Sequence, residues 1–178
     1  MTEIPVNVLQ FDLEKIARDW MLITAGTKEG GFNTMTASWG HLGSIWGHAK
    51  DSFGGLSSVV YIRQSRYTKE FVDREPLYTL SFFPRELQSK LAYLGSHSGR
   101  DGDKVAAVGF TPVFGRGWTG FAEAELTLVC RKLYHAPFDP KGFTDEATFR
   151  DYYGDGDVHE LYIGEIIAAY QGQAEDKR

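Results

Sequence analysis

The feature that most constrains the fold is an alternation of residue types between positions 121 and 133. Small or apolar residues occupy every second position from Ala122 to Cys130, and Glu123, Glu125 and Thr127 lie between them. A period of two is the pattern of a β-strand with one buried face. Other short runs rich in apolar and β-branched residues also predict strands, at positions 20–25, 32–38, 56–62, 77–83 and 159–170.

The predicted strands mostly follow one another, and the helical patterns between them are short. These helices are predicted at positions 12–19, 68–74, 84–94, 101–108 and 140–153. Such an order favours a mainly β fold with inserted helices, a closed antiparallel barrel, over a doubly wound sheet. No linker, repeat or change in composition divides the 178 residues, so we expect a single domain spanning positions 1–178.

Composition and charge argue against several classes of function. The net charge is -5 and no helix carries a basic stripe, which argues against a nucleic-acid partner. No apolar run approaches the ~18 residues of a membrane span, and the N-terminus lacks a signal-peptide pattern. The single cysteine, Cys130, lies in an apolar run and has no disulfide partner, as expected in a reducing compartment. We therefore expect a cytoplasmic protein that binds neither nucleic acid nor a membrane.

A first polar segment, residues 33–40, stands out within its apolar surroundings. It follows a glycine turn and places small residues and two hydroxyl groups, those of Thr36 and Ser38, between Met35 and Trp39. Small residues let a ligand approach the backbone closely, and hydroxyl groups offer hydrogen bonds. The segment is therefore a candidate wall of a ligand site.

A second polar segment, residues 63–68, follows the apolar run 59–62 and contains two arginines, a serine and a threonine. Guanidinium and hydroxyl groups together suit a phosphate monoester, which accepts several charge-assisted hydrogen bonds. Together with the first segment, this composition predicts a bound phosphorylated aromatic ring. The alternative is a solvated, arginine-rich strand end that pairs with nearby acids such as Glu70 and Asp73, and the sequence leaves it open.

A third polar segment, residues 98–101, precedes a predicted helix. Asp101 fits the N-cap, and Lys104 then falls in the first turn, where a cation opposes the helix dipole at a cost of about 0.3–1 kcal/mol. A cation in an unfavourable position indicates a nearby anion, either a ligand phosphate or a carboxylate of a partner subunit. Arg100 would reinforce this positive field.

Other catalytic and cofactor motifs are absent from the sequence. The glycines at 115–117 and 154–156 lack the third glycine of a dinucleotide-binding fingerprint, so a nicotinamide would bind only transiently. The histidines fall in separate elements without ligand spacing, and we predict no metal site. The run 95–99 resembles a nucleophile elbow only superficially, because a helix and not a strand precedes it.

Taken in their order along the chain, these segments resemble the flavin reductase-like proteins, an FMN-binding split-barrel family that includes flavoredoxin. The resemblance rests on residues 33–40, 63–68, 98–101, His159 and Gly164-Glu165, and it covers nearly the whole chain. It implies a split β-barrel homodimer with FMN in a cleft near the subunit interface. The resemblance does not fix the physiological electron donor or acceptor, because the family spreads over several. We expect NADH or NADPH as a transient substrate, and a monooxygenase or another redox protein is a candidate partner.

The resemblance completes the predicted site. His159 would lie beside the open face of the flavin and position the substrate; the alternative is an exposed loop histidine paired with Asp157. Candidate interface segments are residues 40–55 and the region of Trp118. The predicted FMN-binding residues are Asn33, Thr34, Met35, Thr36, Ala37, Ser38, Trp39, Arg63, Ser65, Arg66, Thr68, Ser98, Gly99, Arg100 and Lys104.

Three functions compete at this stage. The sequence favours an enzyme, an NAD(P)H-dependent flavin reductase in which the flavin carries the redox chemistry. A flavoredoxin-like electron carrier that never meets a nicotinamide is the alternative, and nothing in the sequence separates the two. A structural barrel that has lost its flavin is the third, and the intact arginine and hydroxyl positions argue against it.

Overall fold

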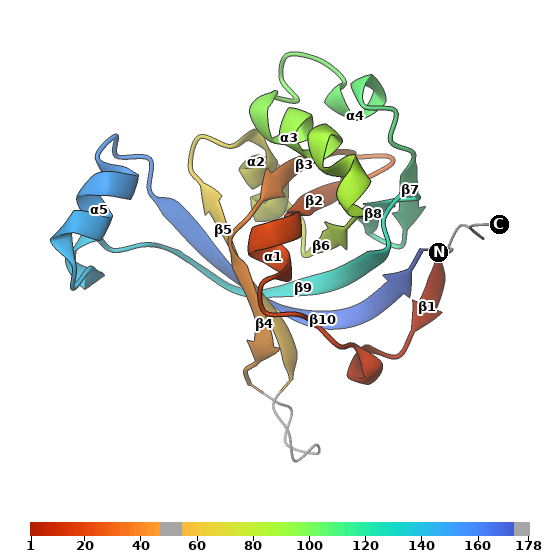
Figure 1. The fold of residues 1–178 in the computed structure, drawn as a ribbon, viewed down its shortest axis with the longest axis horizontal. Helices are drawn as coiled ribbons and strands as arrows, with labels where there is room; N and C mark the ends of the chain where they lie inside the picture. The colour runs from red at the N-terminus through yellow and green to blue at the C-terminus, as the bar shows by residue number, and fades with distance from the viewer. Residues whose placement is uncertain (47–54, 173–178) are drawn as a thin grey trace.

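The computed structural model describes residues 1–46 and 55–172 and contains a large antiparallel sheet (Figure 1). The strand order is β3-β2-β6-β9-β10-β5-β4, β1 pairs with β10, and β7 and β8 form a separate hairpin. The strands are β1 (Thr2–Ile4), β2 (Met21–Thr27), β3 (Gly31–Ala37), β4 (Gly40–Ser44), β5 (Leu56–Arg63), β6 (Leu77–Phe82), β7 (Pro112–Gly115), β8 (Trp118–Phe121), β9 (Leu126–Pro137) and β10 (His159–Gln171).

The two ends of this sheet are consecutive in the chain. β3, at one end of the order, is joined to β4, at the other end, by Ser38 and Trp39 alone. Because this link spans at most roughly 10 Å, the sheet must curl until its first and last strands approach each other. Within the described residues no strand pairing joins β3 to β4, so the barrel is split along this line. The predicted fold class, mainly β with inserted helices, is confirmed.

Two apolar clusters position the elements around the site. Ile23 and Leu80 belong to the barrel interior, whereas Leu22 packs with Leu91 in a second cluster under the helix α3 (Gln88–Ser96). β2 is thus buried on both faces, which explains why its sequence shows no alternation. This packing holds α3 against β3.

The other helices mostly fall where the sequence predicts them. Short 3-10 turns precede three of them, at Val6–Val8, Arg85–Leu87 and Pro140–Gly142. The remaining α-helices are α1 (Lys15–Asp19), α2 (Tyr67–Arg74), α4 (Lys104–Ala107) and α5 (Glu146–Tyr153). None of the helices in the described ranges is long and apolar enough to cross a membrane.

Several predicted elements have the wrong bounds. The helices predicted at 12–19 and 140–153 begin later, as α1 at Lys15 and α5 at Glu146, and two further elements differ more. The predicted strand 121–133 is two strands: β8 ends at Phe121, β9 starts at Leu126, and the amide of Glu125 donates to the Phe82 carbonyl (2.9 Å) in the turn between them. The predicted helix 101–108 is only α4. Its N-cap is Asp103, whose Oδ1 accepts from the amide of Ala106 (2.9 Å), and not Asp101. Lys104 is therefore the first helical residue.

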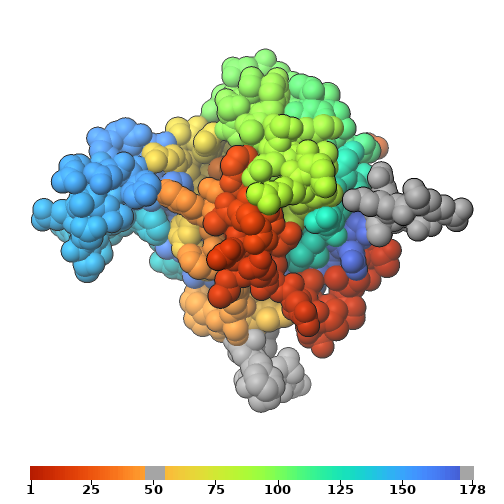
Figure 2. Space-filling view, in the orientation of Figure 1, coloured from red at the N-terminus to blue at the C-terminus, as the bar shows by residue number. Residues whose placement is uncertain are grey.

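An arm between β9 and β10 carries α5 and projects from the barrel (Figures 1 and 2). The two candidate interface segments have different outcomes. Trp118 itself is buried against Tyr170, with ring centroids 4.9 Å apart, whereas Phe114 of the same hairpin is exposed, so an interface in this region stays a prediction. Of the segment 40–55, residues 40–44 form β4, and residues 47–54 lie outside the described residues.

Candidate functional site

A cavity of about 410 Å³ lies where β3, the end of β5, the start of α2 and the end of α3 meet. It brings together residues from all three predicted polar segments. The predicted residues that line it are Asn33, Met35, Arg63, Ser65, Arg66, Thr68, Ser98, Gly99 and Lys104. Its other lining residues were not among the predicted cofactor-binding residues; they are Tyr67, Ser96, His97, Asp155 and Asp157.

One side of this cavity is formed by Arg66 and Lys104, which we call the cationic corner. Arg66 Nη1 donates to the Gly95 carbonyl (2.8 Å), and Lys104 Nζ donates to the carbonyls of Leu94 (2.7 Å) and His97 (2.9 Å). These carbonyls lie at the C-terminal end of α3, where a helix leaves its last carbonyls without partners of its own. Lys104 is buried, and burial together with the charge of Arg66 lowers its pKa to about 8.

The cationic corner has no acidic partner in the described part of the chain. Within residues 1–46 and 55–172, no carboxylate oxygen lies within 4.0 Å of Arg66 or Lys104. A buried ammonium group beside a guanidinium group is electrostatically unfavourable. An anion in the cavity would therefore stabilise both groups, and their remaining N–H donors suit a phosphate.

The cavity is also lined by Asp155 and Asp157 of residues 155–157, which we call the acidic turn. The amide and Oγ of Ser65 donate to the Asp157 carboxylate at 3.1 and 2.6 Å. Arg63 Nη1 lies 3.4 Å from Asp155 Oδ2 and donates to the Asp157 carbonyl (3.0 Å). Burial disfavours a charged Asp157, but the hydrogen bonds from Ser65 and the charge of Arg63 outweigh it and lower the pKa of the Asp157 carboxyl.

The expected acidic partners of the second segment are wrong. Asp73 pairs with Lys69 (2.7 Å), and Glu70 pairs with Arg100. Arg63 does pair with acids, but with those of the acidic turn. Arg100, predicted to bind the cofactor, is engaged by Glu70 and does not line the cavity. That prediction is therefore not supported for its side chain.

Successive side chains of β3 point to opposite faces, so only some side chains of the first segment reach the charged cavity. The hydroxyl oxygens of Thr34 and Thr24 are 2.8 Å apart, and Thr36 donates to the Leu91 carbonyl of α3. Ala37 packs in the barrel core. These three predicted side chains do not line the cavity, because successive residues of a strand point to opposite faces and the strand runs on into the core.

Gly99 lets the third segment approach β3 closely. A Cβ at this position would lie 2.3 Å from Asn33 Oδ1 and 3.3 Å from the Tyr67 ring. The Asn33 side chain is buried and donates from Nδ2 to Thr68 Oγ1 (2.9 Å), so it is not free to move aside. This position therefore requires glycine, and the packing joins the three segments into one site.

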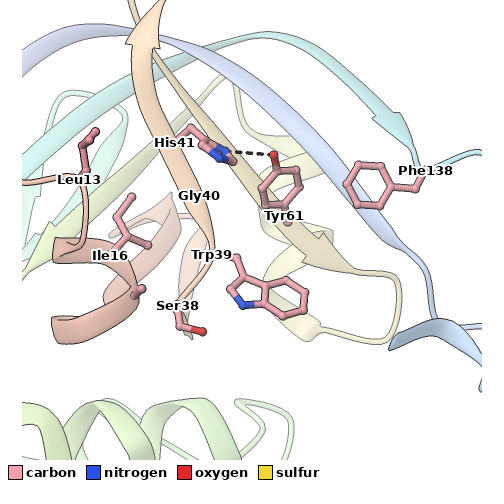
Figure 3. A pocket seen from close by; sticks show the side chains of 9 residues that line it. Leu13, Ile16, Ser38, Trp39, Gly40, His41, Tyr61 and Phe138 are labelled. Atoms are coloured by element: carbon pink, nitrogen blue, oxygen red, sulfur yellow. Dashed lines mark hydrogen bonds between the residues drawn. The ribbon is translucent and has the colours of Figure 1, made fainter. Parts of the chain in front are cut away.

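A second cavity, of about 360 Å³, lies beside Ser38 and Trp39 (Figure 3). Its walls are mainly apolar and aromatic, and Tyr61 forms a hydrogen bond with His41 Nδ1 (3.2 Å) at one side. Tyr61 and Arg63 are two residues apart on β5, so they point to the same face of the sheet. The aromatic cavity and the charged cavity therefore lie along the same face.

His159 opens β10 and is buried, so the alternative of an exposed loop histidine is wrong. Its Nδ1 lies 2.9 Å from the Tyr153 hydroxyl, and its ring contacts Trp39 at a centroid distance of 5.4 Å. Burial and the charge of Arg63 outweigh the opposing effect of Asp157 and lower the pKa of His159 to about 4. The imidazole is therefore neutral near pH 7. His159 lines neither cavity and contacts the second one through Trp39.

One group of side chains could hold a metal ion by geometry, although no sequence spacing indicated it. Ligand atoms of Asp73, His135 and Glu160 lie within 4.8 Å of one another. The ammonium of Lys69, however, lies 2.7 Å from Asp73 and 2.9 Å from Glu160. Because the ammonium of Lys69 already pairs with both carboxylates and occupies the space between them, we assign no metal to this group.

Comparison with known proteins identifies the fold. No family model and no curated protein matches the sequence. Flavoredoxin from Methanosarcina acetivorans is similar in structure, with a TM-score of 0.66 and 21% identity over 93% of this chain and 75% of that one. Nitrilotriacetate monooxygenase component B from Bacillus cereus gives a TM-score of 0.65 and 16% identity over 100% and 86%. The chain therefore has the split-barrel fold of the flavin reductase-like proteins, as its motifs predict.

Proposed function

We propose that this chain is an FMN-binding flavoprotein whose phosphate site is the cationic corner. The observation that carries the proposal is the pair of Arg66 and buried Lys104, which faces a cavity and has no carboxylate within 4.0 Å in the described ranges. A phosphate monoester would supply the missing negative charge and accept several hydrogen bonds. The name of the similar protein flavoredoxin points to the same class of ligand.

The neighbouring residues fit such a ligand. Thr68 and Ser98 line the charged cavity, and Gly99 lets residues 98–101 pack closely against Asn33 beside it. Along the same face of β5, the charged cavity is followed by one with aromatic walls. Both volumes, 410 and 360 Å³, fall in the range of about 300–1,000 Å³ that is typical of small-molecule sites. A charged end and an aromatic end match a phosphate and a planar ring.

We further propose an oxidoreductase, an NAD(P)H-dependent flavin reductase. A bound flavin would accept the hydride, and the protein would supply orientation and electrostatics. Neutral His159 would act as a positioning residue, because it contacts Trp39 and holds Tyr153 of the arm. The alternative is a flavoredoxin-like electron carrier; in either case a monooxygenase or another redox protein would be the partner.

The test is a titration of the purified protein with FMN, followed by a steady-state assay. We expect about one FMN per chain with micromolar or tighter affinity, because the charged cavity compensates the phosphate. NADH and NADPH are then added separately with excess flavin, and their oxidation is followed by absorbance. Oxidation of either supports the reductase. Flavin binding without any oxidation favours the electron carrier, and unchanged FMN fluorescence at micromolar protein would contradict both.

We also propose a cytoplasmic homodimer, supported by an exposed apolar surface on the long strands. Leu133, Tyr134 and Ile167 of β9 and β10 are 42–48% exposed, and Leu56 of β5 is 40% exposed. Exposed large apolar side chains on the long strands would lose their contact with water if a second subunit covered them. We expect sedimentation to give twice the chain mass of 20.0 kDa. A mass of one chain, with FMN bound, would contradict the dimer.

A further inference from the structure

The acidic turn already uses hydrogen-bond donors that a phosphate would need. The Asp157 carboxylate accepts from the amide and the Oγ of Ser65 at 3.1 and 2.6 Å, and it lies 3.8 Å from Arg63 Nη1. A backbone amide, a hydroxyl and a guanidinium group are the donors that bind phosphate oxygens in proteins. At these donors, Asp157 is therefore an anion that belongs to the protein itself.

The charges that line the cavity are mixed. Arg63, Arg66 and Lys104 are positive, and Asp155 and Asp157 are negative. A phosphate dianion at the cationic corner would share the cavity with both carboxylates. Like charges in a partly buried site disfavour each other. A phosphorylated ligand must therefore bind against this repulsion, or displace the acidic turn and break the hydrogen bonds that hold it.

We propose that Asp157 is a specificity-determining residue of the flavin site, an inference that rests on the proposed function. The cost that Asp157 imposes falls on ligands that carry a phosphate. It does not fall on riboflavin, which has the same ring and no phosphate. The carboxylate of Asp157 thus lowers the affinity for FMN but not the affinity for riboflavin, so the ratio of the two affinities becomes smaller. FMN that is bound less tightly is also released and replaced more readily. Arg66 and Lys104, which line the same cavity, act in the opposite direction and favour FMN.

The test compares the affinities of FMN and riboflavin in the wild type, in Asp157→Asn and in a matched control, Asp151→Asn. The control removes the same charge from the same arm, but Asp151 pairs with Arg150 and does not line the cavity. We expect Asp157→Asn to bind FMN about tenfold more tightly than the wild type and riboflavin within about twofold of it. Asp151→Asn should bind both flavins as the wild type does.

Equal or weaker FMN binding by both Asp157→Asn and Asp157→Ser would overturn the proposal, since the carboxylate would then support the site. The comparison is repeated without a flavin by adding inorganic phosphate to each protein and measuring the rise in its Tm. If phosphate raises the Tm of Asp157→Asn more than that of the wild type, the result supports competition between the Asp157 carboxylate and phosphate. An equal or smaller rise in Tm contradicts it. If no protein in the series binds FMN, the proposed function fails, while the phosphate comparison still decides the role of Asp157.

Discussion

Replacing Arg66 with Ala is expected to weaken FMN binding about ten- to a hundredfold and to leave riboflavin binding within about twofold of the wild type. Arg66 faces the charged cavity and is not paired with a carboxylate in the described part of the chain, so its loss leaves the ligand phosphate undercompensated. Loss of a charge-assisted hydrogen bond costs roughly 1.5–3 kcal/mol, which corresponds to this range of affinity. Fluorescence titration of both flavins measures the effect.

Arg100→Ala is the matched control for this experiment. Arg100 belongs to the neighbouring loop, but it pairs with Glu70, lies over the Tyr67 ring at 4.5 Å and does not line the cavity. We expect its loss to change FMN affinity less than about twofold, as for an exposed ion pair. If Arg66→Ala instead weakens FMN and riboflavin equally, the arginine supports the fold through its bond to Gly95, and the phosphate site is wrongly assigned.

The fold class could be predicted because its signals are local. Strand periodicity and turn residues lie within a few positions of each other, and they place most strands and helices correctly. The errors arise where two local signals compete. The alternation of residue types from Ala122 to Cys130 runs through a turn without a break. The turn is held by a hydrogen bond from the amide of Glu125 to β6, a contact distant in sequence that no local pattern shows. Asp103 takes the N-cap that the sequence assigns to Asp101, and the Lys104 that follows it reaches the carbonyl of Leu94 in α3, a contact that local patterns do not show.

The charged half of the site could also be predicted, because Arg66 and Lys104 are unusual for their positions. The acidic turn could not be predicted from local patterns. Asp157 reaches Ser65 across 92 positions of sequence, a contact that exists only because β10 pairs with β5 in the register that sets His159 opposite Arg63. The same limit explains why Thr34 and Thr36 were wrongly expected to face a ligand. Their residue types suit a ligand, but the orientation of the strand directs their hydroxyl groups to hydrogen bonds within the protein.

FMN affinity is expected to fall steeply as the pH rises above about 8, with Lys104 as the cause. Burial and Arg66 lower the pKa of this lysine to about 8, so its charge is lost above that pH in the free protein. Because the ammonium form binds phosphate and the neutral amine does not, FMN binding at higher pH requires Lys104 to take up a proton. Linkage then gives a fall that approaches tenfold per pH unit. The phosphate keeps its second charge above a pKa of about 6, so the affinity should be highest between about pH 6 and 8.

Lys104→Arg isolates this effect, because arginine stays charged throughout the range. Its FMN affinity is expected to stay level between about pH 7 and 9, while Lys104→Met should lose both affinity and pH dependence. Lys104 also donates to the carbonyls of Leu94 and His97, so Lys104→Met will lower the Tm as well. The slope of FMN affinity against pH, with riboflavin as the control ligand, separates ligand charge from stability. An equally steep fall in Lys104→Arg would mean that another group titrates, and Lys104 would then have no part in binding the phosphate.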